Sequence, residues 1–167
     1  MGDESRVWLG LGSNLSDREA QLRAAVAALG GLPATRVVRL SSIYESDPWG
    51  VEGDQPPYLN MAAELATGMP PAELLDACLG IERSLGRVRR ERWEPRPIDL
   101  DLILWGERVL AEDGLTVPHP EFRERRFVLE PLFEIAPDVR DPATGLTVRE
   151  LLSRSADRGR VTRWRAW

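Results

Sequence analysis

The sequence predicts a single α+β domain, in which helices cover one face of an antiparallel sheet and a hairpin or helical segment is added at the C-terminal end. The 167 residues suffice for one domain with a full hydrophobic core. Segments of β and helical patterning alternate in the order strand, helix, strand, strand, helix, strand. The last strand carries two carboxylates on one face. We expect residues 1–167 to form one domain, with a disordered tail at residues 1–6.

The first strand and helix follow this tail. Residues 7–11 are apolar and precede a turn-forming Gly-Ser-Asn group, which is typical of a short buried strand. Ser16 and Glu19 have the spacing of a capping box, which indicates a helix start. Gly10 and Gly12 resemble part of a phosphate-binding loop, although the third glycine of the dinucleotide fingerprint is missing. A phosphate role and a plain strand-to-helix turn therefore both stay open.

Two more strands and a second helix come next. Residues 35–44 and 60–67 are rich in β-branched and apolar residues, which favours strands. Residues 45–57 contain three prolines and two glycines and cannot be regular structure. A long loop of this kind is usually functional in a compact domain. The helix that opens at residues 70–71 places Cys78 on its apolar stripe, so we expect Cys78 to be a core residue.

The rest of the chain supplies the remaining elements. We expect a strand at 98–105, followed by a turn at 106–107 into a partner strand near 109–110. A helix is expected over 122–136, broken near Pro131. A short helix at 146–153, capped by Thr147 or Thr144, and an edge strand at 161–164 complete the chain. The element order matches the ferredoxin-like βαββαβ plan, in which one sheet face stays free of helices.

The strand after the second helix carries the strongest chemical signal. Because side chains alternate along a strand, Asp99 and Asp101 share one face. Ile98, Leu100, Leu102 and Leu104 are expected on the other face. The two carboxylates would lie roughly 6 to 7 Å apart and repel each other by about 2 to 3 kcal/mol. A divalent cation such as Mg²⁺ with substrate phosphates would relieve this repulsion, and so would neighbouring arginines on an exposed strand face. Both interpretations stay open.

Composition excludes several other kinds of site. The single cysteine and single histidine cannot build a zinc site, so a catalytic metal would need oxygen ligands. The chain has no lysine, which excludes a P-loop and Schiff-base chemistry. A net charge of −5 argues against general nucleic-acid binding. Arginines nevertheless cluster within residues 83–96 and 123–126, and such clusters suit a small polyanion.

Composition also indicates where in the cell the protein is expected. The hydrophobic and charged fractions, 43% and 29%, are ordinary for a globular protein, and no apolar run approaches the ~20 residues that cross a bilayer. The first residues lack the apolar region of a signal peptide. We therefore expect a cytoplasmic protein that does not associate with membranes.

The chain resembles the 6-hydroxymethyl-7,8-dihydropterin pyrophosphokinases of the folate pathway from about residue 7 to residue 137. The resemblance rests on an ordered set of short motifs, which together are highly specific: Leu11-Gly12-Ser13-Asn14-Leu15, Ser42-Ile43-Tyr44, Gln55-Pro56-Pro57-Tyr58-Leu59-Asn60, Gly86-Arg87-Val88-Arg89, Arg92-Trp93-Glu94-Pro95-Arg96-Pro97-Ile98-Asp99-Leu100-Asp101, Val117-Pro118-His119-Pro120, Arg125-Arg126-Phe127-Val128-Leu129 and Pro131-Leu132-Phe133-Glu134.

The resemblance implies Mg²⁺-dependent transfer of a diphosphate from ATP to the pterin alcohol, with release of AMP. It implies that Asp99 and Asp101 bind two Mg²⁺ ions and are catalytic together with Arg87 and Arg96. The implied ATP contacts are Arg87, Arg89, Trp93, Arg96, Leu102, Thr116, His119 and Arg125. The implied pterin contacts are Ser46, Asp47, Pro48, Trp49, Tyr58, Asn60 and Phe127. The implied partners are these two small molecules, and we expect a monomer.

Other interpretations compete with this one. From the residues alone, Tyr58 and Phe127 would be core residues and His119 a structural histidine between two prolines. A palm-type nucleotidyltransferase also places two carboxylates on a ferredoxin-like sheet, but it would release pyrophosphate instead of AMP. A non-catalytic ligand-binding or RNA-binding module would need no metal, and an RNA binder should display aromatic residues on its central strands.

Overall fold

The computed structural model describes residues 4–14, 17–47, 57–86, 98–112 and 114–167. In chain order the elements are β1 (Ser5–Ser13), α1 (Arg18–Gly30), β2 (Thr35–Leu40), β3 (Ile43–Ser46), β4 (Tyr58–Thr67), α2 (Pro71–Ser84), β5 (Asp99–Trp105), β6 (Leu110–Glu112), β7 (Leu115–Val117), the 3-10 helix η1 (Phe122–Glu124), α3 (Arg126–Ile135), α4 (Val148–Arg154) and β8 (Val161–Arg165). None of the helices in these ranges is long and apolar enough to span a membrane.

The main sheet is antiparallel and has six strands in the order β5-β1-β4-β3-β8, with β2 also paired to β4. The expected strand at 35–44 is therefore two strands, which share β4 as their partner. They separate at Ser41, whose backbone N–H donates to the Ala62 carbonyl at 3.0 Å while its hydroxyl accepts from the Ala62 N–H at 2.8 Å. The edge strand expected near the C-terminus is confirmed as β8, which pairs with β3.

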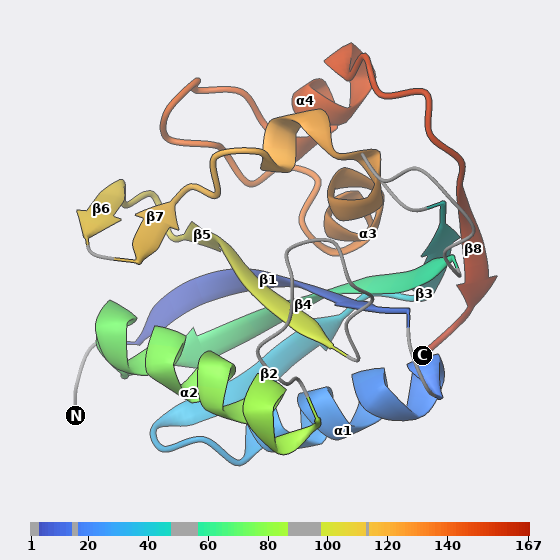
Figure 1. Cartoon of the computed structure of the whole chain (residues 1–167). Helices are drawn as coiled ribbons and strands as arrows, with labels where there is room; N and C mark the ends of the chain where they lie inside the picture. Colours follow the sequence, from blue (N-terminus) through green and yellow to red (C-terminus); the bar gives the residue numbers. More distant parts are fainter. Residues whose placement is uncertain (1–3, 15–16, 48–56, 87–97, 113) are drawn as a thin grey trace.

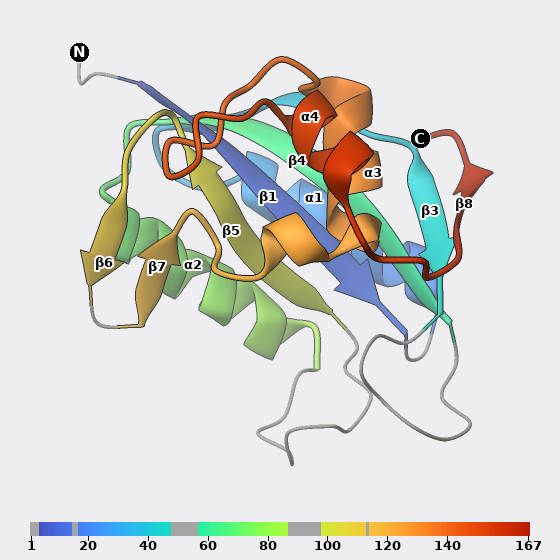
Figure 2. The same ribbon diagram turned by 90° about the horizontal axis from the view of Figure 1, so that it is seen from above.

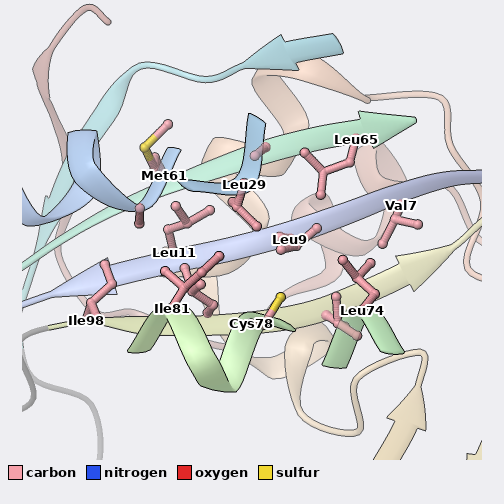
Figure 3. Close-up of a cluster of buried hydrophobic side chains, with 14 of the residues drawn as sticks. Val7, Leu9, Leu11, Leu29, Met61, Leu65, Leu74, Cys78, Ile81 and Ile98 are labelled. Atoms are coloured by element: carbon pink, nitrogen blue, oxygen red, sulfur yellow. The ribbon is translucent and has the colours of Figure 1, made fainter. Parts of the chain in front are cut away.

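Helices cover both faces of this sheet, so the expectation of helices on one face is wrong (Figures 1 and 2). One core lies between the sheet and helices α1 and α2, and Cys78 is buried within it, as predicted (Figure 3). A second core lies between the opposite sheet face and helices α3 and α4. The sheet residues that build it are Trp8, Ala62, Ile103 and Leu104. The architecture is therefore α+β with a helical layer on each side.

Helix α3 contains Pro131 without a break. The interruption lies instead at Arg125, whose extended backbone separates η1 from α3. The apolar side of α3 is buried along its whole length, by Val128, Leu129, Pro131, Leu132 and Ile135. Packing of this stripe on the sheet offsets the backbone hydrogen bond that proline cannot make.

Several local predictions about element ends are corrected. Asp17 caps α1 by accepting from the Ala20 N–H at 3.1 Å, and Ser16, the predicted cap, lies outside the described residues. Residues 5–6 do not belong to a disordered tail, because they open β1 and pair with β4. Strand β6 pairs with β7 and not with β5. The expected cap of α4 is Thr147 and not Thr144, and it forms a capping box in which Thr147 and Glu150 satisfy each other's backbone N–H groups.

Candidate active site

Asp99 and Asp101 lie on one face of β5, as the alternation predicts. Asp99 is opposite Gly12 and Asp101 is opposite Gly10 of β1, and both carboxylates are partly exposed. The side chains at 98, 100 and 102 are buried in the core on the α1 and α2 side. The carboxylates therefore belong to the sheet face on which α3 packs.

A β-bulge ends this alternation. Trp8 is opposite Leu104 while Leu9 is opposite Leu102, so Ile103 is the extra residue on β5. Leu104 consequently points into the second core, and its expected place beside Leu102 is wrong. The Ile103 carbonyl accepts a hydrogen bond from the His119 N–H at 2.9 Å. The bulge thus anchors His119 two residues beyond Asp101 on the strand.

Glu82 of α2 forms a hydrogen bond to the backbone of β5, and the sequence pattern did not identify this residue. Its side chain is 2% exposed on α2, and its carboxylate accepts from the Leu100 N–H at 2.7 Å. Leu100 lies between the two aspartates. Burial, with Glu82 and Asp101 nearby, raises the pKa of the Cys78 thiol to about 12. The signal for Glu82 was its place four residues after Cys78 on the apolar stripe of the helix.

Two glycines form the floor beside the aspartates. Gly12 lies in β1 between Asp99 and Asn60, and Gly10 lies between Asp101 and Ala62. A Cβ at Gly12 would lie 3.4 Å from the Asn60 Oδ1 and 3.6 Å from the Tyr58 ring. Both glycines are inside the strand, so neither forms a phosphate loop or a turn. The missing side chain at Gly12 lets Asn60 and Tyr58 approach the β1 backbone, whereas Ile103 and Val128 cover Gly10, where a Cβ would lie 3.6 Å from the Ile103 side chain.

Ser46, Tyr58 and Asn60 border the far side of this floor. Ser46 pairs with Tyr58 at the end of the β3–β4 ladder, and Asn60 pairs with both Tyr44 and Gly12. The buried Asn60 amide donates to the Ser46 hydroxyl at 2.7 Å. Residues that pair directly across strands share a face. Tyr58, Asn60 and Ser46 therefore share the sheet face of Asp99 and Asp101.

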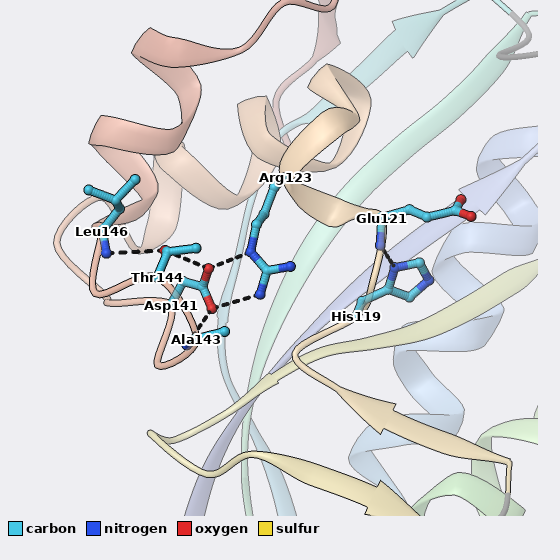
Figure 4. A network of polar contacts seen from close by, with 7 residues as sticks. All are labelled: His119, Glu121, Arg123, Asp141, Ala143, Thr144 and Leu146. Carbon is cyan, nitrogen blue, oxygen red and sulfur yellow. Dashed lines mark hydrogen bonds and ion pairs between the residues drawn. The ribbon is translucent and has the colours of Figure 1, made fainter.

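The segment from His119 to Phe127 approaches from the α3 side. The His119 Nδ1 accepts from the Glu121 N–H at 3.1 Å, so the neutral ring carries its proton on Nε2 (Figure 4). Burial, and the neighbouring Arg125, lower the pKa of His119. The Arg125 guanidinium pairs with Glu121 and lies 5.7 Å from the Phe127 ring centre. This segment therefore presents a neutral N–H donor, a cation and a half-buried aromatic ring.

A buried ion pair holds the same segment to the loop before α4. The Arg123 guanidinium donates to both oxygens of Asp141, which is fully buried (Figure 4). Burial favours protonation of Asp141, but hydrogen bonds from Arg123, Thr144 and the Ala143 N–H lower its pKa below the usual value. Such a bidentate pair fixes the guanidinium geometrically. It fixes η1 between His119 and Arg125.

The chain matches a family model described as 7,8-dihydro-6-hydroxymethylpterin-pyrophosphokinase over residues 8–137. The chain belongs to this family. Three relatives named 2-amino-4-hydroxy-6-hydroxymethyldihydropteridine pyrophosphokinase agree. The protein of Methylorubrum extorquens is 46% identical over 90% of this chain and 93% of its own. That of Pseudomonas aeruginosa is 47% identical over 89% and 90%. That of Bacillus subtilis is 49% identical over 83% and 82%.

Solved structures show the same fold as this family member. The crystal structure of Plasmodium falciparum HPPK-DHPS with pteroate superimposes with a TM-score of 0.74 at 13% identity. The match covers 92% of this chain and 43% of that one, so the chain spans less than half of the longer protein. A second structure of the same protein, with SDX-DHP, gives a TM-score of 0.73.

Not all predicted site residues are brought together. Leu102 turns its side chain into the opposite core, so only its backbone can face a ligand. Thr116 is exposed on β7, and Asp47 is exposed beyond the end of β3, where Arg160 pairs with it at 3.0 Å. Six predicted residues lie outside the described ranges: Pro48, Trp49, Arg87, Arg89, Trp93 and Arg96.

Proposed function

We propose that the sheet face carrying Asp99, Asp101, Gly12 and Asn60 is the active site of this pyrophosphokinase. As a member of the family, the chain transfers a diphosphate from ATP to 6-hydroxymethyl-7,8-dihydropterin, giving AMP and the pterin diphosphate for folate biosynthesis. The observation that carries the site is the shared face of the two aspartates beside a glycine floor. This face offers negative charge for a metal–nucleotide complex, with the aromatic ring of Tyr58 and the amide of Asn60 nearby for a flat ring.

The aspartate pair fits the Mg²⁺ that enzymes of this family use with ATP. Both side chains are partly exposed, and carboxylate oxygens are the hard ligands that Mg²⁺ prefers. We propose that Asp99 and Asp101 together hold two Mg²⁺ ions. Bound there, the ions would neutralise polyphosphate charge and lower the pKa of a bound hydroxyl.

The remaining assignments follow the family motifs. We propose that Arg87, Arg89, Trp93, Arg96, Leu102, Thr116, His119 and Arg125 contact ATP. We propose that Ser46, Asp47, Pro48, Trp49, Tyr58, Asn60 and Phe127 contact the pterin. The described residues support this division, because Ser46, Tyr58 and Asn60 lie across the floor from the aspartates. Aromatic faces suit a flat heterocycle, and fixed amide and hydroxyl groups suit its polar edge.

The reaction needs positioning and a path for one proton. The hydroxymethyl oxygen forms a bond to the β-phosphorus of ATP, the bond from this phosphorus to the oxygen bridging to the α-phosphorus breaks, and AMP leaves. The hydroxyl proton passes to a carboxylate of Asp99 or Asp101. The His119 Nε2–H and the Arg125 guanidinium donate to phosphate oxygens as charge shifts. Arg87 and Arg96 would add fixed positive charge to the same polyphosphate.

We also propose that the chain is one domain on the ferredoxin-like plan and acts as a monomer. Support comes from the strand order β5-β1-β4 with helices α1 and α2 on one side. Strand β8 pairs with β3, so the C-terminal segment belongs to the same sheet. Light scattering at micromolar concentration checks the monomer.

The decisive experiment is to incubate the protein with ATP, Mg²⁺ and the pterin alcohol and to separate the products. We expect equal amounts of AMP and pterin diphosphate, and no product when EDTA removes the metal. Release of pyrophosphate in place of AMP would instead identify a nucleotidyltransferase. Absence of any nucleotide product would contradict the enzymatic assignment.

A further inference from the structure

We propose that Arg18 is a positioning residue for the pterin side of the site. It would act through Glu45, the second-last residue of β3, and through Pro57, which directly precedes β4. The inference rests on the proposed function, because Ser46, Tyr58 and Asn60 define the pterin side there. It concerns only the described ends of the two strands.

One guanidinium nitrogen connects both strand ends. The Arg18 Nη1 donates to the Glu45 carboxylate at 3.0 Å and to the Pro57 carbonyl at 2.8 Å. Glu45 directly precedes Ser46, and Pro57 directly precedes Tyr58. Arg18 therefore ties the chain at the point where the β3–β4 ladder ends.

The contact is better placed than an ordinary surface ion pair. The side chains of Arg18 and Glu45 are 25% and 21% exposed, so water screens them only in part. The guanidinium carbon also lies 6.0 Å from the ring centre of Trp164 on β8. Charge-assisted hydrogen bonds of this kind are stronger than neutral ones. The contact can therefore restrain the backbone near Ser46 and Tyr58.

Arg18 does not serve its own helix. It is the first residue of α1, where the helix dipole disfavours a positive charge. Asp17 already caps this helix end. The favourable interactions of Arg18 are those with Glu45 on β3, the Pro57 carbonyl before β4 and the Trp164 ring on β8. Its placement is thus accounted for by the strand ends and not by helix stability.

The strand ends determine which way the pterin side faces. Ser46 is paired with Tyr58, and the Asn60 amide donates to the Ser46 hydroxyl across the same ladder. A register shift of one residue would turn these side chains to the opposite sheet face. By holding Glu45 inside the ladder and Pro57 just outside it, Arg18 would keep the side chains of Tyr58 and Asn60 directed towards Gly12.

The test compares Arg18→Ala with a matched control on the same helix, Arg23→Ala. Arg23 pairs with Glu19 at 3.3 Å and stacks on Trp167, and neither partner belongs to β3 or β4. We measure the pterin Kd by fluorescence titration, and KM for each substrate with kcat. We expect Arg18→Ala to raise the pterin Kd and KM by about ten-fold. The ATP KM should change less than two-fold, and Arg23→Ala should change neither constant.

Two further variants separate positioning from folding. Arg18→Lys should restore most of the pterin affinity, because both hydrogen bonds come from one nitrogen and an ammonium carries three donors. Glu45→Gln keeps a hydrogen-bond acceptor but removes the negative charge, so it should lose less pterin affinity than Arg18→Ala. This comparison still tests the contact if Arg18→Ala folds poorly. An active wild-type enzyme whose Arg18→Ala form binds pterin normally would overturn the role of Arg18. Equal losses of pterin and ATP affinity would also overturn it, whereas an inactive wild-type protein would refute the proposed function.

Discussion

The backbone N–H of Leu100 donates to the buried carboxylate of Glu82 at 2.7 Å, between the two residues that carry the site's negative charge. Because β5 is an edge strand whose only neighbour among the described strands of the sheet is β1, this hydrogen bond engages a backbone N–H on the outer edge of the strand. The part of β5 that carries the two aspartates is therefore held by α2 as well as by β1.

We predict that Glu82→Leu lowers both stability and turnover. The variant removes the acceptor of the Leu100 N–H, and a buried donor left without its partner costs about 1 to 3 kcal/mol. Movement of the strand should lower kcat by about 10- to 100-fold. Urea unfolding and AMP production measure the two effects. Glu82→Gln retains an acceptor oxygen and should lose less of each; equal losses in both variants would contradict a hydrogen-bonding role.

We predict that Asp99→Ala and Asp101→Ala fold normally but lose turnover by about 10³-fold, since each removes a group that acts on developing charge. Both carboxylates are partly exposed on a sheet whose other face is fully packed, so the core is unaffected. The melting temperature of each variant checks that it is folded. Near-normal AMP production by either variant would refute the assignment.

We predict that Gly12→Val weakens pterin binding while the protein remains folded. Valine favours strands, but its branched side chain would press on the Asn60 amide and the Tyr58 ring. The pterin KM should rise by about ten-fold or more, corresponding to about 1.4 kcal/mol. Gly12→Ala is the matched control, because its single methyl group meets Asn60 at 3.4 Å, an ordinary contact distance. A Gly12→Val enzyme with unchanged pterin KM would show that the floor is not used.

We predict that His119 makes folding stability fall as the pH drops below about 6.5. Burial lowers the pKa of His119 in the folded state, so the unfolded chain binds the proton more readily. Stability therefore rises with pH between the folded pKa and the unfolded value, and is fully present above the latter. The free energy of unfolding, measured from pH 8 to pH 5, should decline more steeply in wild type than in His119→Gln. His119 is the only histidine in the sequence, so the difference reports this group.

The aspartate face could be predicted because polar and apolar residues alternate strictly from 98 to 102. The bulge could not, because residues 102–105 are all apolar and any of them can point to either core. The same ambiguity hid the second helical layer, which Ile103 and Leu104 help to bury. In a continuous apolar run, the sequence does not show which face of the sheet each side chain lies on.

Other parts of the site depend on tertiary contacts that no local pattern encodes. Glu82 reads as a polar residue near a helix end, and only the packing of α2 under β5 reveals its partner. Arg18 likewise reads as a solvent-exposed helical residue, although it bonds to positions 27 and 39 residues away. In α3, Pro131 predicted a break that tertiary packing prevents.

Strand β8 has a consequence for colloidal behaviour. It covers the outer side of β3, and as the new sheet margin it is only five residues long and carries Arg163 and Arg165. At the opposite margin, the Ile103 carbonyl is already engaged by His119. Short, cationic or occupied margins resist strand-to-strand association between molecules. The β5 and β8 margins are therefore poor templates for strand pairing between two molecules of this chain.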